Sequence, residues 1–216
     1  MNVIEIFDSI DGEGVFAGQL ATFIRLSGCN LRCRYCDTGY ALQEGSGKEM
    51  TIPEIIVEVN KIGNKHITLT GGEPLIHKDV KTLIEGLISY GYQVNIETNG
   101  SVPIDDYLSR HTIITLDYKT AGSGEESKML LENWDKLRSC DVVKIVCYAD
   151  DLPSIEELLS KHKTEAQVFL SPVFGKIEPS ELVEFSKLMR DRYGIGDIRV
   201  QLQMHKYIWK PDERGV

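Results

Sequence analysis

Short runs of β-branched and other apolar residues recur along the whole chain, and segments with a helical period lie between many of them. Seven of these runs have the length and composition of buried strands. They are Ala21–Leu26, Ile67–Thr70, Val94–Glu97, Ile113–Leu116, Val142–Val146, Val168–Leu170 and Ile198–Leu202. The pattern therefore predicts strands that alternate with helices from end to end.

Four segments between these strands place apolar residues on one face of a helix. Their apolar positions are Ile55, Ile56, Val59 and Ile62; Val80, Leu83, Ile84, Leu87 and Ile88; Leu130, Leu131, Trp134 and Leu137; and Leu182, Phe185 and Met189. Thr51 and Glu54 have the spacing of a capping box before the first predicted helix, and Gly91 stops the second.

Repeated strand–helix–strand order predicts right-handed crossovers and a parallel sheet with helices outside it. A complete eight-unit α/β barrel typically needs about 250 residues, and this chain has 216. We therefore expect an α/β fold, a partial barrel of the (β/α)6 type, in one domain over residues 1–216. In such a sheet the chemistry gathers at the carboxyl ends of the strands.

The charge balance bears on the partners of the protein. The formal net charge is −9, with 33 acidic residues against 24 Lys and Arg, which argues against a nucleic-acid surface. No stretch has the length of a membrane span, and the start Met1–Glu5 lacks the features of a signal peptide. We expect a cytoplasmic protein without nucleic-acid or membrane partners.

Three of the five cysteines lie within eight residues, directly after the predicted strand that ends at Leu26. Cys29, Cys33 and Cys36 have the spacing C-x3-C-x2-C, so three thiolates can converge on one metal centre from a single loop. A four-iron cluster held by three cysteines would leave one iron open for a small molecule. The alternative is a zinc site that Cys140, Cys147 or a histidine completes. The spacing favours the iron–sulfur centre.

Two motifs resemble those of radical S-adenosylmethionine (radical SAM) enzymes. The loop Cys29–Cys36, with Tyr35 before its last cysteine, is similar to their cluster loop, and Leu69–Pro74 is similar to their second motif. The resemblance implies a [4Fe–4S] cluster held by the three cysteines. S-Adenosylmethionine would bind the fourth iron, and one-electron reduction would yield a 5′-deoxyadenosyl radical.

Further segments narrow the resemblance to the 7-carboxy-7-deazaguanine synthase family, and the likeness covers nearly the whole chain. These segments are Glu5–Gly14, Phe23–Cys29, Cys36–Thr38, Glu97–Gly100 and Gln201–Lys206. The resemblance implies a partial, elaborated α/β barrel in a homodimer. It also implies a lyase that converts 6-carboxy-5,6,7,8-tetrahydropterin to 7-carboxy-7-deazaguanine and ammonia in queuosine biosynthesis. The radical would remove hydrogen from C6 of the pterin, and S-adenosylmethionine would be regenerated.

The same resemblance implies roles for individual residues. Those expected at the cofactor are Tyr35, Cys36, Asp37, Gly71, Gly72, Glu73, Asp117, Tyr118 and Lys119. Those expected at the substrate are Ile10, Asp11, Gly12, Glu13, Arg25, Thr70, His205 and Val216. No protein residue is assigned as a catalytic acid or base, because the bound cofactor supplies the radical. Asp11 stands where the family usually has Gln, and Asp117-Tyr118 where it more often has Ser-Pro.

Several of these residues have a second interpretation. Arg25 would bind the substrate carboxylate or form an internal ion pair with Glu13 or Asp37. Thr38 would help bind Mg²⁺ or cap a helix. The remaining histidines, His66, His77, His111 and His162, are expected at the surface or at strand edges, and Cys140 and Cys147 in the core.

Two other functions fit part of the sequence. One is a radical SAM activase that generates a glycyl radical on a partner protein. The other is a zinc-stabilised binding domain, which leaves Gly71–Pro74 unexplained. For the synthase, we expect a one-electron donor such as flavodoxin or ferredoxin.

Overall fold

The computed structural model describes all residues, Met1–Val216, and contains one nine-stranded sheet in the order β3-β1-β2-β4-β5-β6-β7-β8-β9. The strands are β1 (Asn2–Ile10), β2 (Leu20–Leu26), β3 (Lys48–Glu49), β4 (His66–Gly71), β5 (Gln93–Thr98), β6 (Thr112–Tyr118), β7 (Val142–Cys147), β8 (Gln167–Pro172) and β9 (Arg199–Val200). Neighbouring strands from β2 to β9 are parallel, whereas β1 is antiparallel to both β2 and β3. This confirms the predicted α/β fold with a mostly parallel sheet.

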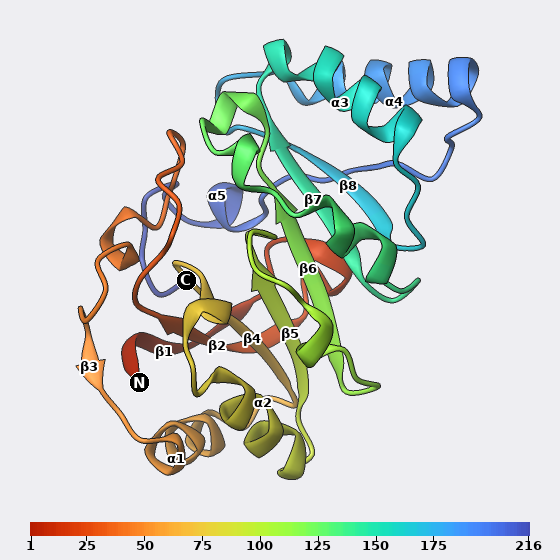
Figure 1. Cartoon of the computed structure of the whole chain (residues 1–216). Coiled ribbons are helices and arrows are strands. Elements are labelled where there is room, and N and C mark those ends of the chain that lie inside the picture. Colours follow the sequence, from red (N-terminus) through yellow and green to blue (C-terminus); the bar gives the residue numbers. More distant parts are fainter.

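Helices cover the outer side of the sheet at its two ends (Figure 1). They are α1 (Ile52–Ile62), α2 (Val80–Ser89), α3 (Leu152–Lys161) and α4 (Pro179–Tyr193), with the short α5 (His205–Ile208) near the C-terminus. The capping box of α1 is confirmed: Thr51 Oγ1 accepts a hydrogen bond from Glu54 N–H, and Glu54 Oε2 accepts one from Thr51 N–H. No helix combines the length and the apolar character needed to cross a membrane.

The helix predicted over residues 130–137 is wrong. That segment forms a 3-10 helix, Leu131–Lys136, in a β6–β7 connection that contains no α-helix. Asn133 donates hydrogen bonds from Nδ2 to the carbonyls of Gly100 and Val102. Trp134 is 1% exposed and packs edge-on against Tyr118. These contacts with neighbouring loops, rather than an amphipathic helical face, decide the local conformation.

The two faces of the parallel strands differ in polarity. Alternate residues such as Ile67, Leu69 and Ile96 belong to a 34-residue hydrophobic cluster shared with the helices. The residues between them, which point to the other face, are polar on several adjacent strands. They include Arg25, His66, Thr68, Thr70, Asn95, Glu97, Thr115, Asp117 and Lys144. The inner face of the curved sheet is therefore a polar surface rather than a second core.

The sheet does not close, and loops bridge the gap between its ends. Gly14 N–H donates to Gln201 Oε1 at 2.6 Å, and Gln201 Nε2 donates back to the carbonyl of Gly14 at 3.0 Å. Met204 N–H also donates to the carbonyl of Gly12. The segment after β9 is thereby held against the loop after β1, so both flank the polar inner face.

Candidate active site

Two loops that carry the predicted motifs meet at the carboxyl ends of β2 and β4. Gly72 N–H donates to the carbonyl of Leu26, and Glu73 N–H donates to that of Gly28. A Cβ on Gly71 would lie 2.2 Å from the oxygen of Leu26, and one on Gly72 would lie 2.1 Å from the oxygen of Gly28. The paired glycines are thus needed for the approach of one loop backbone to the other.

Glu73 joins this pair of loops to the loop after β5. It is fully buried, and its Oε1 accepts hydrogen bonds from Leu75 N–H and Thr98 Oγ1–H, both at 2.9 Å. Its Oε2 accepts one from Asn99 N–H at 2.6 Å. Burial raises the pKa of Glu73 to about 7, although these donors favour the carboxylate. Both oxygens accept hydrogen bonds from protein groups, and the predicted contact of Glu73 with the cofactor stays a prediction.

The three clustered cysteines are partly buried and form no disulfide. Cys29 Sγ lies 3.4 Å from Leu31 N and 3.8 Å from Asn99 Nδ2, both of which donate to it. Burial raises the pKa of all three thiols, that of Cys33 to about 11. Three soft sulfur donors on one loop suit an iron–sulfur cluster, and the N–H hydrogen bonds to Cys29 Sγ are of the kind that stabilises thiolate ligands.

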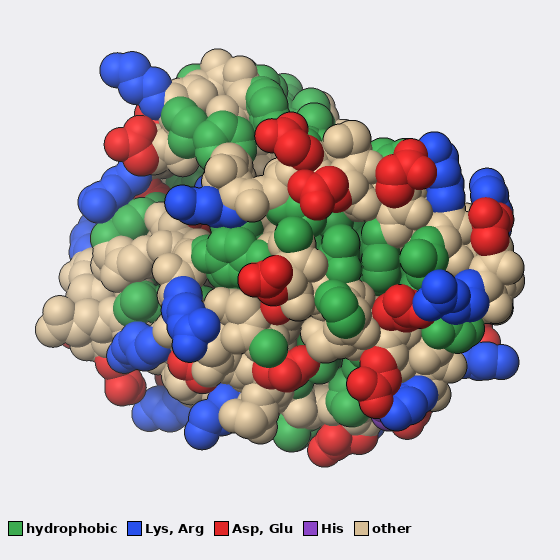
Figure 2. Space-filling view, turned by 90° about the horizontal axis from the view of Figure 1, so that it is seen from above, with side chains coloured by type: hydrophobic (Ala, Val, Ile, Leu, Met, Phe, Trp, Pro, Cys, Tyr) green, Lys and Arg blue, Asp and Glu red, His purple; other side chains and the backbone are tan.

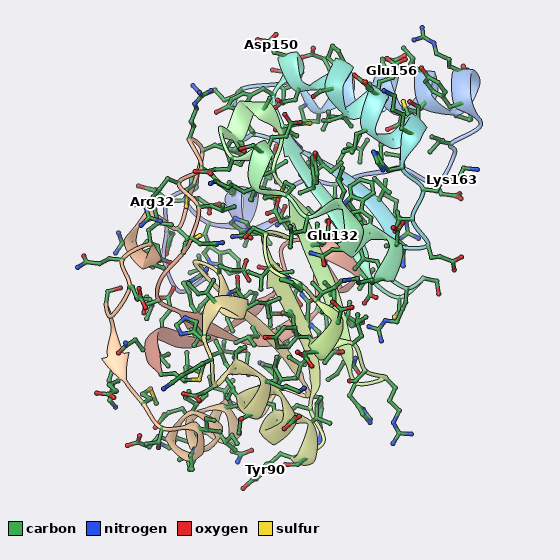
Figure 3. All side chains as sticks on the ribbon, in the orientation of Figure 1. Arg32, Tyr90, Glu132, Asp150, Glu156 and Lys163 are labelled. Atoms are coloured by element: carbon green, nitrogen blue, oxygen red, sulfur yellow. The ribbon has the colours of Figure 1, made fainter.

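Arg32 secures the same loop from outside. Figure 3 shows Arg32 at the edge of the molecule, on the segment after β2, and its Nη1 donates to the carbonyls of Cys29 at 2.6 Å and Leu31 at 2.7 Å. On the face seen from above, Lys and Arg side chains predominate on the left, whereas on the right they alternate with Asp and Glu (Figure 2).

The zinc alternative finds little support in the side-chain positions. No group of three His, Cys, Asp or Glu side chains is arranged to hold a single metal ion. Cys147 is buried in the hydrophobic cluster as predicted, and its Sγ donates to the carbonyl of Ser171. Cys140 is exposed, so its predicted place in the core is wrong. It lies in the turn before β7, beside Asp141, rather than in the strand.

A chain of alternating charges crosses the inner face. Lys144 Nζ lies 3.2 Å from Glu13 Oε2 and 3.1 Å from Asp117 Oδ2, and Lys119 Nζ lies 3.0 Å from Asp117 Oδ1. Burial raises the pKa of Asp117, but the two lysines outweigh this effect and lower it overall. The other oxygen of Glu13, Oε1, is buried and has no hydrogen-bond partner. An unpartnered buried carboxylate oxygen is costly unless a ligand supplies a donor.

A second polar cluster lies deeper on the same face. Asp11 is 1% exposed, and its Oδ2 lies 2.7 Å from His66 Nε2. Thr68 Oγ1 donates to the same carboxylate at 2.9 Å, and the ring of Phe16 covers His66 with centroids 3.9 Å apart. His66 is buried at the first residue of β4, so of its two predicted positions, at the surface or at a strand edge, the surface is wrong. Asp11 has protein partners on both oxygens, and its predicted substrate contact stays a prediction.

Arg25 pairs with neither of the partners considered from the sequence. Its Nε donates to Glu5 Oε1 at 2.7 Å, and its guanidinium lies over the ring of Phe7. No protein group accepts a hydrogen bond from its Nη atoms. Thr70, which is paired with Arg25 in the sheet register, donates to Glu97 Oε2 at 3.0 Å.

The C-terminal segment lies against the loops of the site. Lys206 Nζ is 3.1 Å from Asp37 Oδ2. Burial raises the pKa of Asp37, but Lys206 outweighs it and holds it at about 2. Thr38 Oγ1 donates to the other oxygen of Asp37 and makes no helix-capping bond. His205 packs on Gly12, where a Cβ would lie 2.5 Å from its Nδ1.

The tail beyond α5 continues to the β1–β2 edge. The guanidinium of Arg214 lies 4.0 Å from the centre of the Tyr40 ring, and a Cβ on Gly215 would be 3.8 Å from Glu5 Oε2. Gly215, which precedes the predicted substrate residue Val216, therefore lies beside Glu5 of the Glu5–Arg25 ion pair. In Figure 1 the chain end lies beside β1 and β2.

The structure separates the predicted cofactor residues into two groups. Tyr35 and Lys119 are close, with Nζ 5.7 Å from the ring centre, and Tyr35 donates its hydroxyl hydrogen to the carbonyl of Val146. The side chain of Tyr118 instead belongs to the hydrophobic cluster behind the sheet. Tyr118 is 5% exposed, so a contact of its side chain with the cofactor is not compatible with the structure.

Sequence reasoning assigned no role to four residues of this site: Glu5, Glu97, Asn99 and Lys144. Lys144 interrupts the apolar run Val142–Cys147 at a position that alternates with core residues. Because side chains alternate between the two faces of a strand, a single charged residue in an apolar run indicates a side chain that points to the polar face of the sheet.

The Radical SAM superfamily model matches residues 23–117. Proteins named 7-carboxy-7-deazaguanine synthase are similar over nearly the whole chain. The Clostridium acetobutylicum protein is 39% identical over 99% of this chain and 98% of its own length. The Methanospirillum hungatei protein is 39% identical over 98% of this chain and 86% of its own, and the Chlorobaculum tepidum protein is 37% identical over 100% and 97%.

Among solved structures, that of QueE from Escherichia coli superposes with a TM-score of 0.72, covering 94% of this chain and 93% of the other at 24% sequence identity. The structure of SuiB from Streptococcus suis bound to precursor peptide SuiA gives a TM-score of 0.61, covering 83% of this chain and 48% of the other at 12% identity. These likenesses support the fold.

Proposed function

The chain belongs to the 7-carboxy-7-deazaguanine synthase family of the radical SAM superfamily, and we propose that it carries out the reaction that names this family. It is a radical SAM enzyme that contracts the ring of 6-carboxy-5,6,7,8-tetrahydropterin to form 7-carboxy-7-deazaguanine and release ammonia. The relatives do not favour the activase alternative.

The observation that carries the substrate assignment is a pair of unused polar groups on one face. Arg25 keeps its Nη donors free, and Glu13 keeps one carboxylate oxygen free. A guanidinium binds a carboxylate through two parallel hydrogen bonds, and a carboxylate accepts from the adjacent donors of an amino-pyrimidine. A 6-carboxytetrahydropterin offers both groups at opposite ends of one bicyclic molecule.

The cysteines on the loop after β2 would hold the [4Fe–4S] cluster of this superfamily. Bound there, the cluster would supply the electron that cleaves S-adenosylmethionine. The chain's own part is to fix the loop, through the hydrogen bonds of Asn99 and Arg32 and the backbone contact of Gly72 with Gly28. Tyr35, Asp37 and Lys119 are our candidates for contacts with S-adenosylmethionine.

The proposed function includes a Mg²⁺ site at Thr38. Thr38 is free of a capping role, and its hydroxyl lies 3.0 Å from a carboxylate oxygen of Asp37. Hard oxygen ligands in small number, completed by water and substrate, are what Mg²⁺ uses in enzymes. We assign Thr38 as a Mg²⁺ ligand on this basis. We also expect a flavodoxin- or ferredoxin-type electron donor and a homodimer, as the family resemblance implies.

The test is an anaerobic turnover assay with the reconstituted protein, a reductant, S-adenosylmethionine, Mg²⁺ and 6-carboxytetrahydropterin. We expect 7-carboxy-7-deazaguanine and ammonia in equal amounts, identified by mass spectrometry and an ammonia assay. If 5′-deoxyadenosine forms without this product, the radical chemistry stands and the substrate assignment is wrong. If neither forms with an intact cluster, the proposed function is wrong.

A further inference from the structure

Lys144 lies at the middle of the polar inner face and is the only lysine on β7. Its side chain is 7% exposed, and its ammonium has two carboxylate neighbours, Glu13 and Asp117, at 3.2 and 3.1 Å. A buried ammonium is strongly destabilising unless carboxylates surround it. The two contacts therefore both stabilise the lysine and fix the two acids relative to one another.

The two acids belong to different parts of the site. Glu13 follows β1, in the segment assigned to the pterin, and its Oε1 is free for a ligand. Asp117 is near the end of β6, and its second oxygen holds Lys119, which lies over Tyr35 in the cysteine loop. A continuous line of ionic contacts thus runs from the candidate pterin site to the candidate cofactor site.

We propose that Lys144 is a positioning residue that couples the binding of the carboxylated pterin to the binding of S-adenosylmethionine. The inference rests on the proposed function for the identity of the two ligands. A pterin that bonds to Glu13 fixes this carboxylate, and Lys144 passes the constraint to Asp117 and Lys119. Each ligand then binds to charges that the other already holds in place, so the first ligand to bind tightens the binding of the second.

A serine at position 117 tests the role of the carboxylate in this line. With Ser there, the ionic line would end at Lys144, because a hydroxyl cannot hold two ammonium groups as a carboxylate does. The substitution Asp117→Ser is therefore a small change that breaks the line and leaves the contact of Lys144 with Glu13 in place. It separates coupling from simple loss of the buried lysine.

The test is anaerobic calorimetric titration of the cluster-loaded protein, without reductant so that no turnover occurs. The Kd of S-adenosylmethionine is measured with and without saturating 6-carboxytetrahydropterin. We expect the pterin to tighten S-adenosylmethionine binding about 5- to 100-fold in the wild type, and the ratio to fall to about 1 in Lys144→Met and Asp117→Ser. Lys161→Met, which removes an exposed lysine on α3, should keep the wild-type ratio.

Iron content and melting temperature establish that each variant is folded and loaded. If Lys144→Met fails to fold, the ratio of Kd values in Asp117→Ser alone tests the coupling. A wild type that binds both ligands without coupling, or an Asp117→Ser variant that keeps the wild-type ratio, would overturn the inference and leave the proposed function intact. A wild type that does not bind the pterin at all would instead contradict the proposed function.

Discussion

Glu5 and Arg25 face one another across the antiparallel β1–β2 pair, and Glu5 Oε1 lies 2.7 Å from Arg25 Nε. Tyr40 donates its hydroxyl hydrogen to the same oxygen at 2.8 Å. The contact uses the side of the guanidinium that carries Nε and leaves the other donors free. Glu5 therefore orients Arg25 for a second carboxylate, which we assign to the substrate.

Replacing Arg25 with Ala should raise the Kd of the carboxylated pterin about 10- to 100-fold, because charge-assisted hydrogen bonds contribute about 1.5–3 kcal/mol. The affinity for S-adenosylmethionine should change much less. Arg25→Lys keeps the charge but cannot form two parallel hydrogen bonds to a carboxylate. Its Kd for the pterin should therefore lie between those of the wild type and Arg25→Ala. Anaerobic titration with each ligand measures both affinities. An equal loss for both ligands would instead mean that the pair of Arg25 with Glu5 is purely structural.

Replacing Cys33 with Ala should remove one of the three proposed cluster ligands. We expect reconstituted protein with much less iron and sulfide, and no reductive cleavage of S-adenosylmethionine. The matched control is Cys140→Ala, which removes an exposed cysteine elsewhere on the chain. Iron analysis and detection of 5′-deoxyadenosine report the two effects, and full cleavage by Cys33→Ala would refute the ligand set.

Replacing Gly72 with Ala should displace the cysteine loop, since the new Cβ would lie 2.1 Å from the oxygen of Gly28 and 2.7 Å from Cβ of Cys29. Overpacking of this kind costs about 1–3 kcal/mol of unfolding free energy. Gly39→Ala is the control, because nothing lies within 4 Å of the Cβ it would add. The free energy of unfolding, measured with denaturant, and the iron content should both be lower in Gly72→Ala and unchanged in Gly39→Ala. Equal stability of the two variants would show that the loops can separate freely.

Glu73 gives the stability a specific dependence on pH. Burial raises its pKa from 4.5 to about 7, so between these values the folded protein binds more protons at Glu73 than the unfolded chain. The free energy of unfolding should then fall as the pH rises through this range, by on the order of 3 kcal/mol from this group. Glu73→Gln removes the titration and should show a smaller slope from pH 5 to 8 in denaturant unfolding. An unchanged slope would show that Glu73 is ionised throughout.

The parallel strands were predictable because each is an apolar run with a side that packs against helices or against buried residues of the connections. All seven predicted runs correspond to strands, although Ile198–Leu202 contains only the two-residue β9. β1 was not predicted as a strand. It is antiparallel to its neighbours, and Glu5, Phe7 and Asp8 lie among its isoleucines, so it is not a continuous apolar run. The α3 helix was also missed, although Leu152, Ile155, Leu158 and Leu159 follow a helical period.

Only the parts of the site that form contiguous sequence motifs were predictable. The cysteine loop and Gly71–Glu73 are contiguous in sequence, so their residue types carry the signal. The pairs of Lys144 with Glu13 and of His66 with Asp11 join residues more than fifty positions apart. Such contacts depend on strand order and register, which a single sequence does not specify residue by residue.

The most direct test of the central claim is to follow hydrogen from C6 of the pterin. The assay uses 6-carboxytetrahydropterin with deuterium at C6, under anaerobic turnover conditions, with mass spectrometry of the recovered S-adenosylmethionine. Our account predicts that deuterium appears in the 5′-deoxyadenosyl part of S-adenosylmethionine while 7-carboxy-7-deazaguanine accumulates. Accumulation of product with no deuterium in the cofactor would contradict hydrogen removal from C6 by a radical formed at this site.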